Sequence, residues 1–213
     1  MTKNWRADRK REQYYRKAKR ENYRSRAAYK LKEIDFKYDL IHPGDRVVDL
    51  GASPGGWSQV AAELVGGDGE VYALDLARFS PIERVTFVRG DIRKDSVVAR
   101  LLEHMPQGAD VVLSDMAPNI SGNYTYDHAR SVDLCEHALA FASQVLKEGG
   151  NFVTKVFYGD MTKGLVSVAR RSFDEVHITH PKATRSTSSE VYVVGIGFNG
   201  ARFSPRSASS ERS

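Results

Sequence analysis

Lys155 calls for a chemical explanation because it interrupts the apolar run NFVTKVF at residues 151–157. Burying an ammonium group costs several kcal/mol unless the charge is paired or neutralised. Asp115 in LSDMAPN ends one predicted strand, Glu190 in SSEVYVV opens another, and Lys30 borders a predicted helix. Two lysines and two carboxylates brought together could accept a proton or stabilise a developing negative charge.

A glycine-rich turn and two later aspartates predict a nucleoside site. The stretch VVDLGASPGGWSQV (47–60) is typical of a strand, a turn and a helix, but has neither the dinucleotide fingerprint nor a P-loop. Asp75 ends the next strand, where a carboxylate can bind ribose hydroxyls, and Asp91 follows the third, within reach of an adenine amino group. Each aspartate alone could be a turn or cap residue. Asp49 and the absence of basic residues from the turn favour S-adenosylmethionine over NAD or ATP.

The elements that must position these residues alternate between strands and helices. Strands are predicted at 45–51, 70–76, 83–91, 109–118, 151–157, 174–180 and 189–198, and helices at 56–65, 96–105, 129–150 and 162–173. We take the glycines that end the third helix as its C-cap. The connection PKATRSTSS is too short for a parallel crossover, so the last two strands should pair antiparallel. The predicted fold is α/β: a seven-stranded, mainly parallel sheet with an antiparallel last strand and helices on both faces. This is the outline of a Rossmann-like, class I methyltransferase domain.

One more helix is predicted ahead of the sheet. Its apolar stripe recurs at helical spacing and comprises Ala27, Leu31, Ile34 and Tyr38. Ser25 is the expected N-cap. Lys30 falls at the edge of the stripe, where a lysine taken alone is usually a snorkelling surface residue.

Positive charge is concentrated at the N-terminus. Residues 1–38 hold 14 Lys and Arg against 5 Asp and Glu, whereas the remainder holds 18 against 22. Tyrosines are interleaved with these basic residues, which suits phosphates and unpaired bases, although a solvated, partly disordered leader is the alternative. We therefore expect a basic arm (1–24), a methyltransferase domain (25–199) and a disordered Ser/Arg-rich tail (200–213).

Several classes of protein are disfavoured by composition. A single cysteine, Cys135, excludes a disulfide framework and indicates a reducing, cytoplasmic setting; we expect it to be a small buried hydrophobe. No apolar run approaches the roughly 20 residues of a membrane span. His177 and His180 should face opposite sides of a strand, so no metal site is expected.

The motifs YRSRAAYKL, DLGASPGGWSQ, LSDMAPN, FVTKVF and SSEVYVV resemble those of the FtsJ/RrmJ family of RNA ribose 2′-O-methyltransferases, in the family's order. The resemblance spans residues 12–198. It implies a catalytic tetrad of Lys30, Asp115, Lys155 and Glu190. It also implies S-adenosylmethionine contacts at Gly55, Trp57, Asp75, Asp91 and Asp115.

The resemblance also assigns roles in the reaction. Lys155 would be the base for the ribose hydroxyl; burial favours its neutral amine, whereas Asp115 and Glu190 favour the ammonium, which would instead stabilise an alkoxide. Glu190 would hold Lys155, and Lys30 would orient the ribose. The sequence DMAP lacks the second proline and the aromatic residue that are typical of enzymes that methylate the amino groups of bases. Cys135 lies on a predicted helix and not at a strand end, which disfavours methylation of a base at C5 through a cysteine nucleophile.

The expected substrate is RNA and not DNA, because the 2′-hydroxyl distinguishes the two. The basic arm resembles that of members which methylate a uridine of 23S rRNA. A tRNA anticodon-loop enzyme and a non-catalytic ribosome-assembly factor are the alternatives. We expect a monomer that does not contact membranes.

Overall fold

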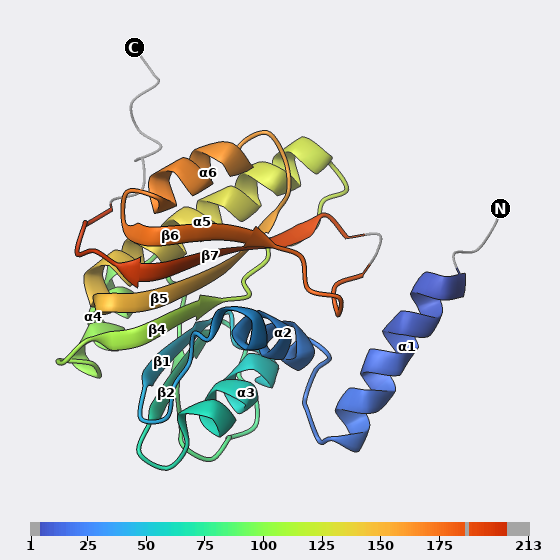
Figure 1. The fold of residues 1–213 in the computed structure, drawn as a ribbon, viewed down its shortest axis with the longest axis horizontal. Coiled ribbons are helices and arrows are strands. Elements are labelled where there is room, and N and C mark those ends of the chain that lie inside the picture. Colours follow the sequence, from blue (N-terminus) through green and yellow to red (C-terminus); the bar gives the residue numbers. More distant parts are fainter. Residues whose placement is uncertain (1–4, 186–187, 204–213) are drawn as a thin grey trace.

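The computed structural model describes residues 5–185 and 188–203, with side chains from residue 13 onward (Figure 1). The helices are α1 Trp5–Arg20, α2 Ala28–Tyr38, α3 Gly56–Val65, α4 Asp95–Glu103, α5 Tyr124–Val145 and α6 Thr162–Ala169. The strands are β1 Arg46–Leu50, β2 Glu70–Asp75, β3 Val85–Arg89, β4 Ala109–Ser114, β5 Leu146–Phe157, β6 Phe173–Thr179 and β7 Glu190–Phe198. In the described residues, no helix is both long and apolar enough to cross a membrane.

The seven strands form one sheet in the order β3-β2-β1-β4-β5-β7-β6. The first five strands in this order are parallel to one another, and β7 is antiparallel to both β5 and β6. The predicted fold class is therefore confirmed, including the closing hairpin. From β1 the chain continues to β2 and β3 on one side of β1, whereas β4 lies on the other side. The strand order therefore reverses between β1 and β4, and open α/β sheets bind ligands at such a point.

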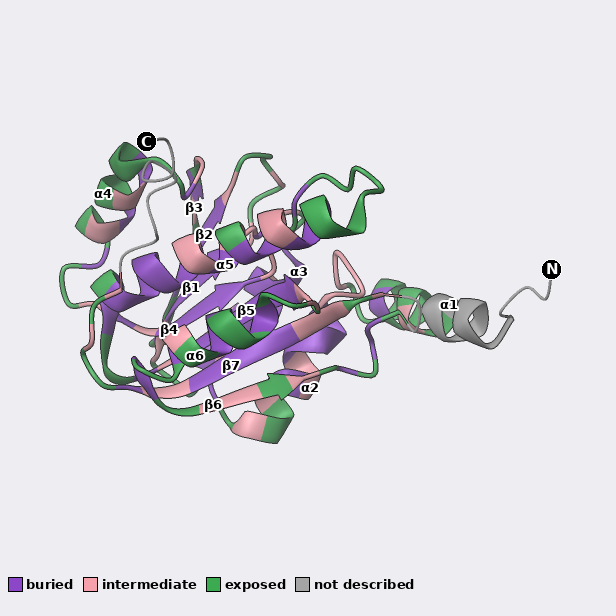
Figure 2. Cartoon of the chain, turned by 90° about the horizontal axis from the view of Figure 1, so that it is seen from above, coloured by how far each residue is buried: buried purple, intermediate pink, exposed green. Residues whose placement is uncertain are grey.

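Helices cover both faces of the sheet (Figures 1 and 2). One core cluster joins β1 through Val48 and Leu50 to α4 and α5, and another joins it through Val47 to α2 and α3. Because successive side chains of a strand point to opposite faces, the two valines and the leucine divide between the two clusters. The centre of the sheet is thereby buried, and its strand ends are left to carry the polar residues.

The predicted helix over 129–150 was wrong at both ends. α5 begins at Tyr124, because the side chain of Asn123 accepts a hydrogen bond from the Tyr126 amide at 3.2 Å. It ends at Val145, and Leu146 starts β5 directly, pairing with Ala109. The glycines after Leu146 lie where the pairing of β5 with β4 shifts register, and they are not a helix C-cap.

Ser25 is not the N-cap of α2, contrary to the prediction. A tight turn precedes the helix, in which the amides of Ala28 and Tyr29 donate to the carbonyls of Ser25 and Arg26. These main-chain bonds replace a side-chain cap, and α2 starts after Ala27. The other predicted elements lie within a few residues of the observed ones.

The two ends of the chain, where an arm and a tail are expected, are described in part. Residues 5–20 form helix α1, which projects away from the sheet (Figure 1). Most of the predicted tail, residues 204–213, lies outside the described residues. Phe203 is fixed to α5, since its amide donates to the Ser143 hydroxyl at 3.0 Å and its carbonyl accepts from that hydroxyl at 3.2 Å.

Candidate functional site

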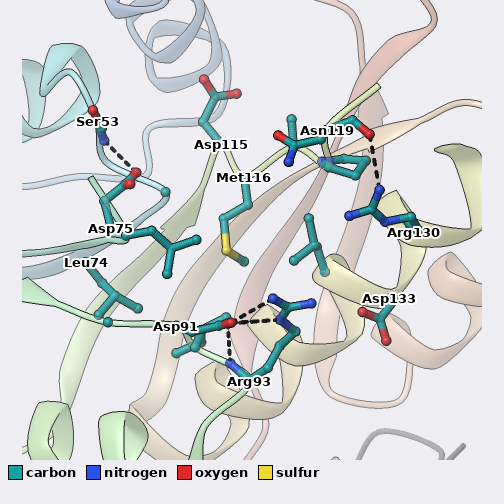
Figure 3. A pocket seen from close by; sticks show the side chains of 17 residues that line it. Ser53, Leu74, Asp75, Asp91, Arg93, Asp115, Met116, Asn119, Arg130 and Asp133 are labelled. Carbon is teal, nitrogen blue, oxygen red and sulfur yellow. Dashed lines mark hydrogen bonds and ion pairs between the residues drawn. The ribbon is translucent and has the colours of Figure 1, made fainter. Parts of the chain in front are cut away.

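A cavity of about 390 Å³ opens at the carboxyl ends of β1, β2 and β4 (Figure 3). Its lining includes Asp75, Asp91 and Asp115, three of the residues predicted to bind a cofactor. Parallel strands place their carboxyl ends at one edge of a sheet, so residues distant in sequence meet there. The cavity also contains residues that sequence reasoning missed: Ser53, Met116, Asn119, Arg130 and Asp133.

Asp75 fixes the glycine-rich turn above the cavity. Its carboxylate accepts hydrogen bonds from the amides of Ser53 at 2.9 Å and Ala77 at 2.7 Å. A carboxylate has about four acceptor positions, so the oxygens of Asp75 can still accept from two ligand hydroxyls. The sequence placed Asp75 at a strand end, and the structure adds that it also shapes the turn.

Asp91 is paired with Arg93, which the sequence did not predict. Nη2 of Arg93 lies 2.7 Å from the Asp91 carboxylate, and Nε at 2.9 Å contacts its other oxygen. The Arg93 guanidinium holds the pKa of Asp91 below its usual value. Asp91 is therefore a fixed anion at the cavity wall, and a ligand amino group would have to use its remaining acceptor positions.

Gly55 and Trp57 lie outside the cavity lining. Gly55 has a φ of +104° and precedes the first turn of α3. The Trp57 indole is buried beneath α2, where Nε1 donates to the Ala27 carbonyl at 2.8 Å and the ring packs 5.6 Å from that of Tyr192. Their predicted cofactor contacts stay predictions, and a contact from Trp57 would have to come from its main chain.

The four residues of the predicted tetrad meet beside this cavity as two ion pairs. Nζ of Lys155 lies 3.0 Å from Oδ1 of Asp115, and it also donates to the Asp115 carbonyl. Nζ of Lys30 lies 3.0 Å from Oε2 of Glu190. Both lysine side chains are 7% exposed, so each charge is balanced by a carboxylate where solvation is poor.

The pairing differs from the expected one in one respect. Glu190 was expected to hold Lys155, but its hydrogen-bond partner is Lys30. Burial raises the pKa of Glu190, but the charges of Lys30 and Lys155, together with hydrogen bonds from Lys30 and Ser188, hold that pKa below its usual value. Glu190 thus acts on Lys155 through its charge, while Asp115 holds Lys155 directly.

Tyr192 is a fifth member of the cluster that sequence reasoning missed. Its hydroxyl donates to Oδ1 of Asp115 at 2.8 Å, and Nζ of Lys30 lies 5.6 Å from the centre of its ring. Burial, followed by the negative charge of Asp115, holds the pKa of Tyr192 well above its usual value, so the phenol keeps its proton. The signal was present in the sequence, because Glu190 and Tyr192 are two residues apart and point to the same face of a strand.

Asp49 is a fully buried acid at the end of β1. Its Oδ2 accepts from the Ser58 hydroxyl at 2.6 Å, and Oδ1 has no hydrogen-bond partner among the described residues. Burial raises the pKa of Asp49 from 3.8 to about 7, although the Ser58 hydrogen bond opposes the shift. The folded state therefore retains a proton on Asp49 at pH values where the unfolded chain has lost it.

Asp49→Asn is expected to change how stability depends on pH. Between about pH 4 and 7, unfolding of the wild type releases this proton, so its free energy of unfolding falls as pH rises. The free energy of unfolding of the wild type minus that of the variant should fall by up to about 4 kcal/mol across this window and be flat above it. Urea unfolding at a series of pH values measures the difference.

Ser58→Ala is the matched variant for this experiment. Removing the hydroxyl that stabilises the carboxylate raises the pKa of Asp49 further, so the fall in stability should extend to higher pH. Parallel profiles of the wild type and Asp49→Asn from pH 4 to 7 would contradict the assignment.

The cavity fits S-adenosylmethionine. Its lining holds four aspartates and two arginines, and one of these arginines, Arg93, is neutralised by Asp91. A site with excess negative charge suits a ligand that carries a sulfonium and an ammonium group. Asp75 would bind the ribose hydroxyls and Asp91 the adenine edge, while Asp115 lies between the cavity and Lys155.

Comparison with known proteins gives one consistent family. The FtsJ-like methyltransferase family matches residues 23–198. A ribosomal RNA large subunit methyltransferase E from Methanosarcina acetivorans is 50% identical over 190 residues, covering 89% of this chain and 69% of the relative. A relative of the same name from Methanothermobacter thermautotrophicus is 47% identical over 202 residues, covering 94% of this chain and 96% of the relative.

Solved structures agree with this assignment. The crystal structure of a ribosomal RNA methyltransferase from Plasmodium falciparum superposes with a TM-score of 0.77 at 34% identity and covers 84% of this chain and 100% of that one. A fibrillarin from Aeropyrum pernix, solved with S-adenosylmethionine, has a TM-score of 0.57 at 16% identity over 79% of this chain and 76% of its own, and shares the fold. The family match covers most of the chain, and the chain therefore belongs to the FtsJ-like methyltransferases, enzymes that use S-adenosylmethionine.

Proposed function

We propose that this enzyme methylates the 2′-hydroxyl of a ribose, that of a uridine in 23S rRNA, in the large ribosomal subunit. The observation that carries the proposal is the position of Lys155. Its amine is buried against Asp115 at the edge of the cofactor cavity, next to the Lys30–Glu190 pair. A hydroxyl nucleophile needs such a group, because it is weakly acidic and must lose a proton as it reacts.

S-adenosylmethionine, when bound, supplies an electrophilic methyl group. The chain's own residues would position the hydroxyl and manage its proton. Nζ of Lys155 has two acceptors, the carbonyl and Oδ1 of Asp115. A neutral amine would donate both of its hydrogens to them and direct its lone pair at the hydroxyl, whereas an ammonium would direct its third hydrogen at the developing alkoxide.

Lys30 and Glu190 would complete the charge balance around the ribose. They come from α2 and the first residue of β7, and are brought together by the packing of α2 on the sheet. Lys30 has low exposure and is fixed by Glu190, so it can orient a substrate oxygen without a large loss of side-chain entropy. Tyr192 would fix Asp115 by donating to it.

Two basic segments support RNA as the substrate. Ala18 of α1 packs with Tyr29 and Ala183, which places the arm beside the connection that carries Lys182 and Arg185. Both of these basic side chains are exposed. The two segments thus form one basic surface next to the helix of Lys30, which suits a backbone of phosphates leading to the active site.

Removing residues 1–20 is expected to weaken RNA binding and to flatten its salt dependence. Each lost phosphate contact lowers the slope of log K against log salt by about 0.7–0.9. Filter binding at several salt concentrations measures this slope. Lys182→Gln with Arg185→Gln is the matched variant, because it removes two charges from the same surface and leaves the packing of Ala18 and Tyr29 in place. An unchanged slope in both proteins would contradict the proposed surface.

The relatives favour ribosomal RNA over tRNA. Both relatives described above are named as large subunit rRNA methyltransferases. The alternative of a non-catalytic assembly factor is disfavoured, because all four tetrad residues are present and meet beside the cavity. The proposed enzyme would act as a monomer in the cytoplasm, where ribosomal RNA is found.

The test is transfer of tritiated methyl groups from S-adenosylmethionine to large ribosomal subunits, free 23S rRNA and tRNA. We expect label in the large-subunit rRNA, resistant to alkaline cleavage because the methylated 2′-oxygen can no longer attack the adjacent phosphate. If only tRNA were labelled, the substrate would be tRNA and not rRNA. No label in any RNA would refute the proposal.

A further inference from the structure

A group of exposed apolar side chains lies beside the tetrad. Tyr124, Tyr126 and Tyr158, which we call the aromatic rim, are 59%, 55% and 55% exposed, and Ile120 and Met161 are 75% and 48% exposed. They lie in the segments that follow β4 and β5, the strands that lead to Asp115 and Lys155. The first turn of α5 is seen at the surface in Figure 2. Clustered exposed apolar side chains next to a site indicate a binding surface.

The two segments that carry the rim are joined by hydrogen bonds. The Tyr124 hydroxyl donates to the Tyr158 carbonyl. His128 is buried between the segments, with Nδ1 2.8 Å from the Phe157 carbonyl and Nε2 accepting from the Met161 amide at 3.1 Å. Segments whose main chain is already ordered lose less entropy on binding a ligand than mobile segments do.

The rim extends from the cofactor cavity to the tetrad. The Arg130 guanidinium lies 5.4 Å from the centre of the Tyr126 ring and donates to the Asn119 carbonyl at 3.2 Å, and both Arg130 and Asn119 line the cavity. At the other end, the Tyr158 amide donates to the carbonyl of Ser189, the residue before Glu190, at 2.8 Å. A nucleotide whose ribose reached Lys155 would therefore lie next to the segments that carry these rings.

We propose that Tyr126 and Tyr158 stack on unpaired bases that flank the target nucleotide, an inference that rests on the proposed function. Sequence-specific RNA recognition targets single-stranded segments, whose bases stack on aromatic side chains. The exposed carboxylate of Asp160 lies between Tyr158 and Met161 in sequence and would repel phosphates. The rim therefore suits bases, while α1 and its neighbouring segment suit the phosphate backbone.

The test compares Tyr126→Ala and Tyr158→Ala with Tyr126→Phe and Tyr158→Phe. Each alanine variant should raise the apparent KM for RNA by about tenfold with little change in kcat, because a stacked flanking base contributes equally to ground-state and transition-state binding. The phenylalanine variants keep the ring and should resemble the wild type. Phe36→Ala is the matched control, since Phe36 is 93% exposed on α2. Calorimetry should show unchanged affinity for S-adenosylmethionine.

A second arm changes the RNA. Oligonucleotide substrates with abasic residues on either side of the target should raise KM for the wild type and should cause no further rise in the alanine variants. If the wild type methylates an RNA and the alanine variants have the same KM for it, the stacking inference is overturned and the proposed function stands. If the alanine variants showed a raised KM on intact ribosomal subunits but not on free RNA, the inference would be overturned in favour of a contact with a ribosomal protein. If the wild type methylates no RNA, the proposed function falls, and this inference with it.

Discussion

Lys155→Ala is expected to lower kcat for methyl transfer to RNA by about 10²–10⁴-fold, the range for loss of a general base or a positioned charge. Affinity for S-adenosylmethionine should change little, because Lys155 lies beyond Asp115 and does not line the cavity. Single-turnover rates and calorimetry measure the two quantities separately. Equal losses in both would place Lys155 in the cofactor site and contradict its proposed role.

Two further variants make this experiment specific. Lys163→Ala removes an exposed lysine of α6 and should leave kcat unchanged. Lys155→Arg keeps a positive charge that is effectively always protonated but has a different shape. Activity close to wild type in the arginine variant would show that Lys155 acts as a cation, and loss of activity would favour a proton acceptor held in one geometry.

Gly51→Ala is expected to remove S-adenosylmethionine binding and to destabilise the fold. Gly51 has a φ of +76°, and a Cβ there would lie 2.6 Å from Cγ and 2.9 Å from Cα of Met116. Met116 follows Asp115, whose amide donates to the Leu50 carbonyl at 3.1 Å, so relief of the clash would separate the ends of β1 and β4. The free energy of unfolding should fall by about 2–4 kcal/mol, the combined cost of a left-handed non-glycine residue and overpacking.

Gly44→Ala separates the two contributions. Gly44 has a φ of +87° but nothing within 4 Å of its Cβ position. The Gly44→Ala substitution should lower the free energy of unfolding only by the conformational cost, about 1–2 kcal/mol, and should leave cofactor affinity unchanged. Chemical denaturation and calorimetry on both variants measure the outcome. Equal destabilisation by the two substitutions, with cofactor binding retained in Gly51→Ala, would show that Met116 does not restrict the turn.

The sequence alone was sufficient to predict the sheet and the strand ends that carry the acids. Alternating strands and helices, with apolar runs that end in Asp75, Asp91 and Asp115, are local patterns, and parallel topology brings such ends together. The lysine in NFVTKVF was also informative, because a charge in a core strand requires a partner. Cys135 is buried, as expected, and burial raises the pKa of its thiol to about 12.

The start of α5 shows where local patterns were insufficient. Three aromatic and β-branched residues, Tyr124 to Tyr126, have modest helix propensity, and the helix was expected only after them. The Asn123 cap and the contacts of His128 with the segment after β5 stabilise this turn instead. These contacts also bring together the two segments that carry the aromatic rim. Tyr124 and Tyr158, which are hydrogen-bonded to each other, are 34 residues apart in the sequence.

The sequence by itself determined the fold class, the position of the cofactor loop and the identity of the four charged residues. Only the tertiary structure decided that Lys155 pairs with Asp115, that Lys30 pairs with Glu190 across 160 residues, and that Tyr192 joins them. Periodicity reports which face of a strand or helix a residue occupies, and so it placed these side chains near one site. Which lysine meets which carboxylate depends on the packing of α2 against the sheet, and no local pattern in the chain encodes that distance.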